Sequence, residues 1–286
     1  MTSRFPISVS EDAPPRDPSK VIYPGYGRCI YCGSQDGSLS DEHIIPLSLG
    51  GLLIIEKATC VECSKITGKN EGAVARSLFG NFRMRHKLPT RRPKQRPKSI
   101  PLRFVSDPSP DPSRTVPVEE FPAPAFMYKY LKAGILQGLP PTVDTVGQWQ
   151  IIGVAEQVEL EAFGAKYGKG VTYSFRHVPE QFARTLAKIG HCYAVATFGL
   201  DAFQPLAVDT ALGRTKNLTY VVGGSFDIEP AVPDAGHLLN AEIATDGFIS
   251  QITVGIRLFA SAATPSYHVV VGTAAGIPKA IANRPG

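Results

Sequence analysis

Two cysteine pairs, Cys29-Ile30-Tyr31-Cys32 and Cys60-Val61-Glu62-Cys63, flank the sequence Asp41-Glu42-His43-Ile44-Ile45-Pro46 and decide the fold of this part of the chain. Two thiolates separated by two residues can bind one zinc ion together, and two such pairs complete a tetrahedral site. The opening sequence Met1-Thr2-Ser3-Arg4 lacks the apolar region of a secretory signal, so the paired CxxC motifs favour a metal over disulfides. We therefore predict a structural zinc ion with four ligands, which are Cys29, Cys32, Cys60 and Cys63.

The residues between the pairs predict a β-β-α unit around this zinc ion. Residues 41–46 form a polar cluster that leads into a short apolar strand, and residues 52–55 predict a second strand. Gly50-Gly51 predicts the turn between them. The second cysteine pair then opens a helix. This arrangement would present His43 and its neighbouring carboxylates on the first strand.

Together these motifs resemble the HNH endonucleases of the zinc-stapled ββα-metal type, over residues 26–80. The resemblance implies that Glu42 is a ligand of the catalytic divalent cation and that His43 is the general base. Both residue types suit these roles, because a histidine titrates near neutral pH and a carboxylate offers a hard oxygen to Mg²⁺ or Mn²⁺. Asp41 would orient His43. Neighbouring strand residues point to opposite faces, so Glu42 and His43 share one cleft only if the strand twists or His43 reaches around its edge.

Two departures from the family pattern affect the expected site. Residues 52–58 contain no asparagine, whereas the family often has one there that holds the histidine in place. Ser64 follows the last cysteine, where the family commonly has histidine or asparagine as a second metal ligand. Helical spacing places Glu71 on the same face as Ser64, so we expect Glu71 as the substitute ligand, with Asn70 behind it. An ordinary solvated helix residue is an equal alternative for Glu71, and a buried core histidine is the alternative for His43.

A basic segment follows this unit. The chain has a net charge of +5, yet residues 83–103 contain nine Lys or Arg and no Asp or Glu, which leaves about −4 for the rest. Regularly spaced prolines favour an extended chain there, and such a chain can follow a phosphate backbone without reading sequence. A solvated linker is the alternative. The residues expected to contact nucleic acid are Arg83, Arg85, Lys87, Arg91, Arg92, Lys94, Arg96 and Lys98.

The organisation predicted for the whole chain is α+β, with the nuclease-like module followed by a second domain. That second domain is expected to be α+β with a mainly antiparallel sheet, because apolar residues alternate in 252–258 and a pairing segment follows at 267–272. Further strands are predicted at 149–154, 171–177, 218–222 and 238–244. The predicted divisions are a flexible arm (1–20), the HNH module (21–82), a basic, proline-rich connector (83–124) and the α+β domain (125–286).

One helix is predicted in the second domain. It begins at Pro179, buries Phe182 and Leu186, and stops at Gly190. A thiol nucleophile is one interpretation of the adjacent Cys192, but a buried and inert cysteine is favoured because its apolar neighbours are typical of a core.

The function expected from these residues is a metal-dependent endonuclease that cleaves double-stranded DNA, with zinc as structural metal and Mg²⁺ or Mn²⁺ as catalytic metal. A cytoplasmic location follows from the lack of a signal or an apolar run long enough for a membrane. The resemblance also suggests an effector of bacterial defence, in which residues 125–286 bind a second copy, a signal or a partner protein. The alternatives are a non-catalytic zinc module that binds DNA or RNA, and a zinc ribbon that binds protein.

Overall fold

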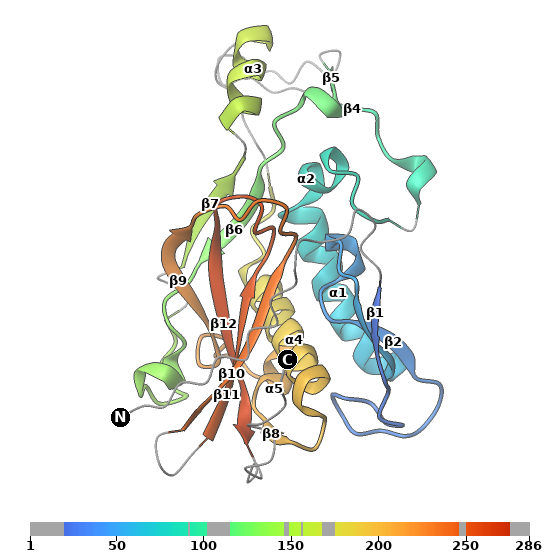
Figure 1. Ribbon diagram of the computed structural model, residues 1–286, viewed down its shortest axis with the longest axis vertical. Helices are drawn as coiled ribbons and strands as arrows, with labels where there is room; N and C mark the ends of the chain where they lie inside the picture. The colour runs from blue at the N-terminus through green and yellow to red at the C-terminus, as the bar shows by residue number, and fades with distance from the viewer. Residues whose placement is uncertain are drawn as a thin grey trace.

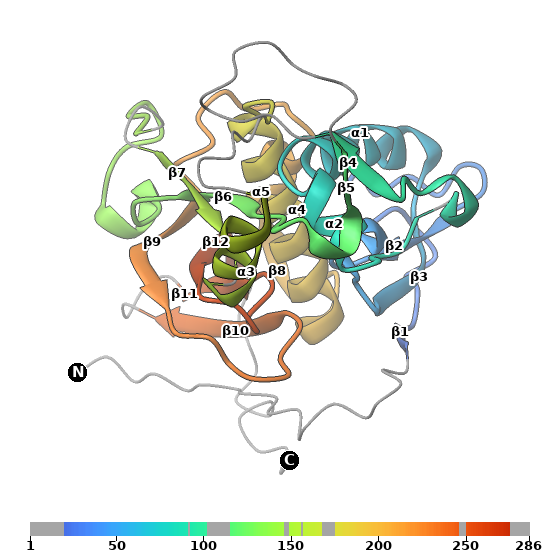
Figure 2. The same cartoon turned by 90° about the horizontal axis from the view of Figure 1, so that it is seen from above.

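The computed structural model describes residues 20–90, 92–101, 115–145, 149–155, 157–167, 175–245 and 250–274. It is a mixed α+β structure with mainly antiparallel sheets, as the sequence predicted. Helix α4 (Pro179–Phe198) lies between the largest sheet and helix α1 (Val61–Ser77) (Figure 1). The view from above shows the same order, with α4 near the centre of the molecule (Figure 2).

The N-terminal module is a small sheet packed beside α1. Its strands β1 (Val21–Tyr23), β2 (Ser40–His43) and β3 (Leu53–Thr59) have the order β1-β3-β2, in which β2 and β3 are antiparallel. A short 3₁₀ turn, η1 (Leu47–Leu49), connects β2 to β3. Strand β2 stops at His43, earlier than predicted, because Pro46 lacks an amide hydrogen and leads into this turn. The predicted β-β-α order is otherwise confirmed.

The largest sheet is built from the C-terminal part of the chain. Strand order is β10-β11-β12-β8, and β9 also pairs with β12; every pairing is antiparallel. Val254 lies opposite Val269, which confirms the predicted pairing of 252–258 with 267–272. The strands are β8 (Phe203–Pro205), β9 (Val222–Glu229), β10 (Leu238–Thr245), β11 (Ser250–Arg257) and β12 (Thr264–Ala274).

The prediction that Gly190 ends α4 was wrong. The helix continues to Phe198, and Gly190 lies where the helix approaches strand β12 most closely. A Cβ atom at position 190 would lie 2.8 Å from Cβ of Val269. Gly190 therefore permits close packing of helix on sheet, which is the second reason a chain uses glycine besides a helix end.

The other predicted strands have mixed outcomes. Strand β7 (Gln150–Val154) pairs with β6 (Ala125–Lys129), and β10 forms at the predicted 238–244. Residues 218–221 form a turn instead of a strand, because Asn217 Oδ1 accepts a hydrogen bond from the amide of Tyr220 at 3.1 Å. Such local side-chain bonds favour turns over strands. Of the strand predicted at 171–177, residues 171–174 lie outside the described residues, and residues 175–177 form no strand.

The connector is only partly extended. Helix α2 (Gly80–Arg85) includes the first two basic residues, because it ends before the first proline of the segment, Pro89. The predicted spacer at 107–112 lies outside the described residues. The remaining elements are η2 (Pro93–Gln95), β4 (Ser99–Pro101), β5 (Thr115–Pro117), η3 (Val118–Glu120), η4 (Gly134–Gln137), α3 (Gln157–Tyr167) and α5 (Ala207–Ala211).

One hydrophobic core runs from the N-terminal module into the C-terminal sheet. Across it, the hydroxyl of Tyr31 lies 3.1 Å from Cys192 Sγ, and His191 Nε2 lies 2.8 Å from the carbonyl oxygen of Ile30. Burial raises the pKa of Cys192 to about 12, in keeping with the expected inert thiol. The domain boundaries stay a prediction. Among the described helices, none is long and apolar enough to cross a membrane.

Candidate active site

The sulfur atoms of Cys29, Cys32, Cys60 and Cys63 lie within 4.8 Å of one another. A tetrahedron with Zn–S bonds of ~2.3 Å has sulfurs about 3.8 Å apart, and Cys32 Sγ and Cys60 Sγ are 3.7 Å apart. All four cysteines are free of disulfides. They are thus arranged for a possible zinc site, and their soft sulfur donors suit that metal.

Local backbone geometry prepares both halves of this site. The chain turns tightly after Cys29, whose carbonyl accepts a hydrogen bond from the amide of Gly33 at 2.9 Å. Gly33 has a φ of 73°, which glycine adopts without strain. Cys60 is the N-cap of α1, and Cys63 follows in the first turn of the same helix. A zinc ion would therefore join the turn to the start of the helix.

His43 is the last residue of β2, and its side chain is half-buried. Its Nδ1 lies 3.2 Å from the carbonyl oxygen of Gly51. Because a carbonyl oxygen can only accept, Nδ1 carries the proton and the neutral ring keeps its lone pair at Nε2. Burial lowers the pKa of His43, which favours that neutral form at pH 7. The ring can therefore accept a proton at Nε2.

Gly51 can orient His43 only because it has no side chain. A Cβ atom at position 51 would lie 1.8 Å from the carbonyl oxygen of Ile45. The preceding Gly50 has a φ of 94°, in the left-handed region. The Gly50-Gly51 turn therefore brings a main-chain oxygen to the imidazole, although residues 52–58 lack the asparagine that often holds the histidine in the family.

Glu42 and Glu71 converge on one atom, the ammonium nitrogen of Lys188 from α4. This Nζ lies 2.7 Å from Glu42 Oε1 and 2.9 Å from Glu71 Oε1. It also donates to the main-chain oxygens of His43 and Ile44, the latter at 3.3 Å. The side chain of Lys188 is only 1% exposed. Two acids of the N-terminal module thus hold a buried cation that the C-terminal part of the chain supplies.

The charges in this cluster depend on one another. Burial alone would lower the pKa of Lys188, but Glu42 and Glu71 outweigh burial and raise it, so Lys188 stays protonated. Burial raises the pKa of Glu42, and Lys188 offsets part of that rise. A buried charge without a partner is costly, so each of the three groups requires the others.

Neither Asp41 nor Asn70 is among the residues that contact Lys188 Nζ in the described part of the chain. Asp41 Oδ1 accepts a hydrogen bond from the amide of Lys57 at 3.0 Å, at an irregularity in the pairing of β2 with β3. The bond that orients the His43 ring comes from Gly51 instead. Asn70 is buried on α1. Their roles as orienting residue and metal ligand stay predictions.

The basic segment contains two kinds of side chain. Arg83 and Arg96 are partly buried and donate to main-chain oxygens, and Arg85 forms an ion pair of 2.5 Å with Glu159. Burial lowers the pKa of Arg83, and the positive charge of the nearby Arg96 lowers it further. Arg91 lies outside the described residues. The exposed basic side chains are Lys87, Arg92, Lys94 and Lys98.

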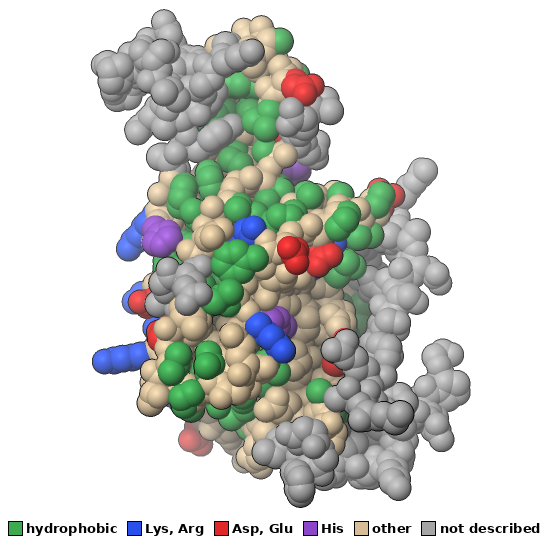
Figure 3. Space-filling view, turned by 90° about the vertical axis from the view of Figure 1, so that its left-hand side faces the viewer, with side chains coloured by type: hydrophobic (Ala, Val, Ile, Leu, Met, Phe, Trp, Pro, Cys, Tyr) green, Lys and Arg blue, Asp and Glu red, His purple; other side chains and the backbone are tan. Residues whose placement is uncertain are grey.

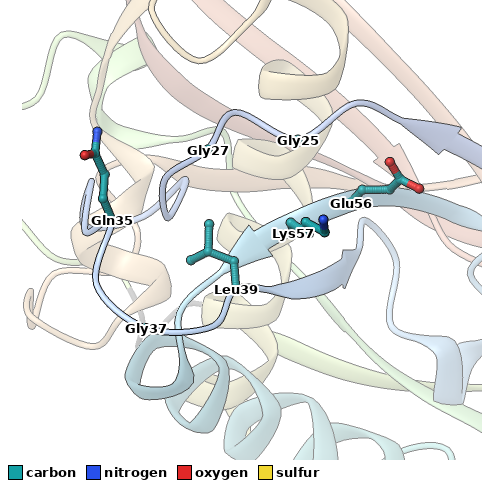
Figure 4. Close-up of a pocket in the computed structure, with 7 residues that line it drawn as sticks. All are labelled: Gly25, Gly27, Gln35, Gly37, Leu39, Glu56 and Lys57. Carbon is teal, nitrogen blue, oxygen red and sulfur yellow. The ribbon is translucent and has the colours of Figure 1, made fainter.

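Two shallow hollows lie on the N-terminal half of the structure. One, of about 210 Å³, is lined by arginines of the basic segment, Arg83, Arg92 and Arg96 among them. The other, of about 370 Å³, lies between a glycine-rich loop and β3, where Glu56 and Lys57 lie (Figure 4). His43 and the two acids that contact Lys188 line neither hollow.

The face of the molecule on the side of β9 differs from the basic segment. In its coloured part, Lys and Arg side chains stand apart among hydrophobic and neutral groups, without a continuous basic patch (Figure 3). A polyanion would find its concentrated positive charge on the segment after α1 instead.

Residues 29–76 match a family model described as HNH endonuclease. The match begins at the first zinc cysteine and includes both acids that contact Lys188, but it spans about a sixth of the chain. No curated protein and no solved structure matches the chain. An HNH endonuclease domain indicates a nuclease, with nucleic acid as its partner.

Sequence reasoning missed Lys188 and Gly51. Lys188 lies between Leu186-Ala187 and Ile189-Gly190, on the apolar side of the predicted helix, and a lysine at a buried helical position indicates an acidic partner. That pattern could have identified it, although not its partners. Gly51 was predicted as a turn residue, but its main-chain contact with His43 has no sequence pattern.

Proposed function

We propose that this protein is an endonuclease that hydrolyses phosphodiester bonds of DNA, with His43 as the general base. The observation that carries the proposal is the His43 ring itself. It lies in a segment similar to HNH endonucleases, and Gly51 fixes its tautomer so that Nε2 is the basic atom. Deprotonation of water requires a positioned base that is in its neutral form at the working pH.

The reaction assigned to this site is attack of water on phosphorus. His43 Nε2 takes a proton from the water molecule, whose oxygen forms a bond to phosphorus while the bond to the 3′ oxygen breaks. The leaving 3′ oxygen takes up a proton from a solvent water molecule, and His43 Nε2 returns its proton to the solvent, which yields a 3′-hydroxyl, a 5′-phosphate and the neutral ring. The Gly51 carbonyl stabilises the imidazolium that forms, because it accepts the Nδ1 hydrogen bond throughout.

The proposed structural metal is a zinc ion bound by the four cysteines, which would join the turn after Cys29 to the start of α1. For the catalytic metal, the sequence predicts Mg²⁺ or Mn²⁺, which would polarise the phosphate and stabilise the leaving oxygen. Carboxylates are the right donors for either ion. However, Lys188 Nζ occupies the point on which Glu42 and Glu71 converge, so the residues as placed do not admit an ion there.

The basic segment supports a nucleic-acid substrate. Four exposed basic side chains can contact a phosphate backbone, namely Lys87, Arg92, Lys94 and Lys98. Such contacts do not depend on the base sequence. We propose double-stranded DNA as the substrate. An effector role in bacterial defence, in the cytoplasm and with a second copy or a partner protein bound through residues 125–286, stays a proposal that rests on the family resemblance.

A non-catalytic zinc module that binds DNA or RNA is the second candidate. One observation favours it, namely that Lys188 Nζ forms ion pairs with both carboxylates from which a metal-dependent nuclease would bind its cation. This candidate predicts salt-sensitive binding of nucleic acid without any cleavage.

Cleavage of end-labelled oligonucleotides separates the two candidates. Zinc-loaded full-length wild type, His43→Ala and His177→Ala are incubated with duplex DNA, single-stranded DNA and RNA, with and without Mg²⁺. His177 is exposed and bonded to Tyr128, so its variant is the matched control. We expect duplex DNA to be cut by wild type and control, and the His43→Ala rate to fall by about 10²–10⁴. Equal rates for all three proteins would remove His43 from the mechanism.

A further inference from the structure

The carboxylates of Glu42 and Glu71 form part of an oxygen cage around Lys188 Nζ. Four oxygen atoms contact this nitrogen, two from carboxylates and two from the main chain of His43 and Ile44. Negatively charged and carbonyl oxygens are the donors that hard divalent cations select. The cage therefore has the donor set of a cation site, and the cation in it is an ammonium group.

The dimensions of the cage fit an ammonium ion. Carboxylate oxygens lie ~2.0–2.1 Å from Mg²⁺ and about 2.3–2.6 Å from Ca²⁺, whereas charge-assisted N–H···O contacts are roughly 2.7–2.9 Å. The contacts to Glu42 and Glu71 measure 2.7 Å and 2.9 Å. The two carboxylate oxygens thus lie at ion-pair distance from a nitrogen and farther than either metal would hold them.

Lys188 is also held in place by its helix. It belongs to the buried stretch of α4, and the adjoining residues Ala187 and Ile189 are fully buried. Further along the helix, Gly190 packs against strand β12. Because α4 is packed on both sides, Lys188 cannot swing into solvent without opening the shared core.

We propose that Lys188 permanently takes the place of the divalent cation in this HNH-type module, so that Glu42 and Glu71 bind no Mg²⁺ or Mn²⁺ in the folded protein. The ammonium group forms ion pairs with both acids and donates to the main chain of His43. It also couples the nuclease-like module to the C-terminal part of the chain. The inference depends on the cage and not on cleavage, so a protein that cuts no nucleic acid still permits a decisive test.

The test is binding of Mn²⁺ to zinc-loaded full-length protein, measured by electron paramagnetic resonance. Wild type, Glu71→Gln and Lys188→Met are compared. Lys188→Met keeps the unbranched stem of the side chain and removes the terminal ammonium group, so the two acids become available for a metal. We expect no Mn²⁺ at the cage in wild type, and hence identical titrations for wild type and Glu71→Gln. Lys188→Met is expected to gain one bound Mn²⁺ per chain.

Lys188→Met can also fail to fold alone, since it leaves buried acids without a cation. In that case we expect Mn²⁺ to restore folding, seen as recovery of the near-ultraviolet circular dichroism of wild type. Three results would overturn the proposal. They are a wild-type Mn²⁺ site that disappears in Glu71→Gln, a folded Lys188→Met that binds no Mn²⁺, and a Lys188→Met that stays unfolded with saturating Mn²⁺.

Discussion

At the scale of single residues, the site depends on atoms that main chain and side chain bring together. His43 gains its orientation from a carbonyl group, and the glycine that supplies this carbonyl is constrained by Ile45. Pairing Nδ1 with a fixed acceptor selects one tautomer and one ring orientation. Changes at Gly51 should therefore affect both folding and the base.

Gly51→Ala is predicted to destabilise the protein by about 1–3 kcal/mol, because the added methyl group overlaps the main chain of Ile45. Urea unfolding measures the loss. The matched control is Gly68→Ala on α1, where a Cβ atom meets nothing within 4 Å. That change should raise stability by up to about 1 kcal/mol, as expected inside a helix. A Gly51→Ala protein as stable as the control would refute the close contact.

His191 should make stability depend on pH. Burial lowers its pKa to about 4 in the folded protein, from 6.5 in the unfolded chain. As pH falls below 6.5, the unfolded chain binds the proton first, so folding is weakened between pH 6.5 and 4. The full stabilisation is present above this window. From these pKa values we expect the free energy of unfolding to drop by about 2 kcal/mol from pH 7 to 5 through His191.

The measurement is urea unfolding of wild type and His191→Gln at both pH values. Glutamine keeps a donor for the carbonyl of Ile30 but does not titrate. Burial also lowers the pKa of His237 and His268 to about 4 each, so both proteins lose stability in acid. The difference between them isolates His191, and an equal loss in the two proteins would contradict the prediction.

At the scale of elements, α4 is the structural centre of the molecule. It contacts α1 on one side and the strands β11 and β12 on the other. Its buried positions include a lysine, a histidine and a glycine, each of which has a distinct partner across the core. Helix propensity alone disfavours Gly190, so its position in the helix interior points to packing against the sheet.

Gly190→Ala should therefore destabilise the protein, although the same change usually strengthens a helix. The new methyl group would lie 2.8 Å from Cβ of Val269, and overpacking of this kind costs about 1–3 kcal/mol. Gly164→Ala on α3 is the control, because a Cβ atom there meets nothing within 4 Å. The melting temperatures of both variants are measured by thermal unfolding. A higher melting temperature for Gly190→Ala than for wild type would contradict the close contact between Gly190 and Val269.

At the scale of the whole molecule, zinc and the shared core should make the described parts unfold together. The core cluster includes side chains from Cys29 to Val271. Chelation of zinc is predicted to lower the single melting temperature by an amount on the order of 10 °C, since zinc sites contribute several kcal/mol to folding. Calorimetry of zinc-loaded and zinc-free protein measures this. Two separate transitions, with the second unaffected by zinc, would show independent domains.

Sequence alone predicted the features that depend on local spacing. The CxxC pairs, the β-β-α order and the alternation in 252–258 are all set within short windows, so the zinc site and the strand pairing could be anticipated. Contacts between distant segments could not. Lys188 lies 145 residues from His43 along the chain, and no periodicity links a helical lysine to two acids elsewhere. Gly190 was misjudged for the same reason, because Val269 determines its role.

The most direct test of the account is nicking of supercoiled plasmid by zinc-loaded wild type and His43→Ala, in buffer freed of Mg²⁺ and Mn²⁺ and again with Mg²⁺ added. Zinc content is measured in both proteins so that folding is matched. We expect nicking by wild type in both buffers at similar rates, and nicking slower by about 10²–10⁴ for His43→Ala. Equal nicking by the two proteins, or no nicking by wild type in either buffer, would contradict the proposed base, and nicking only with Mg²⁺ would contradict the role of Lys188.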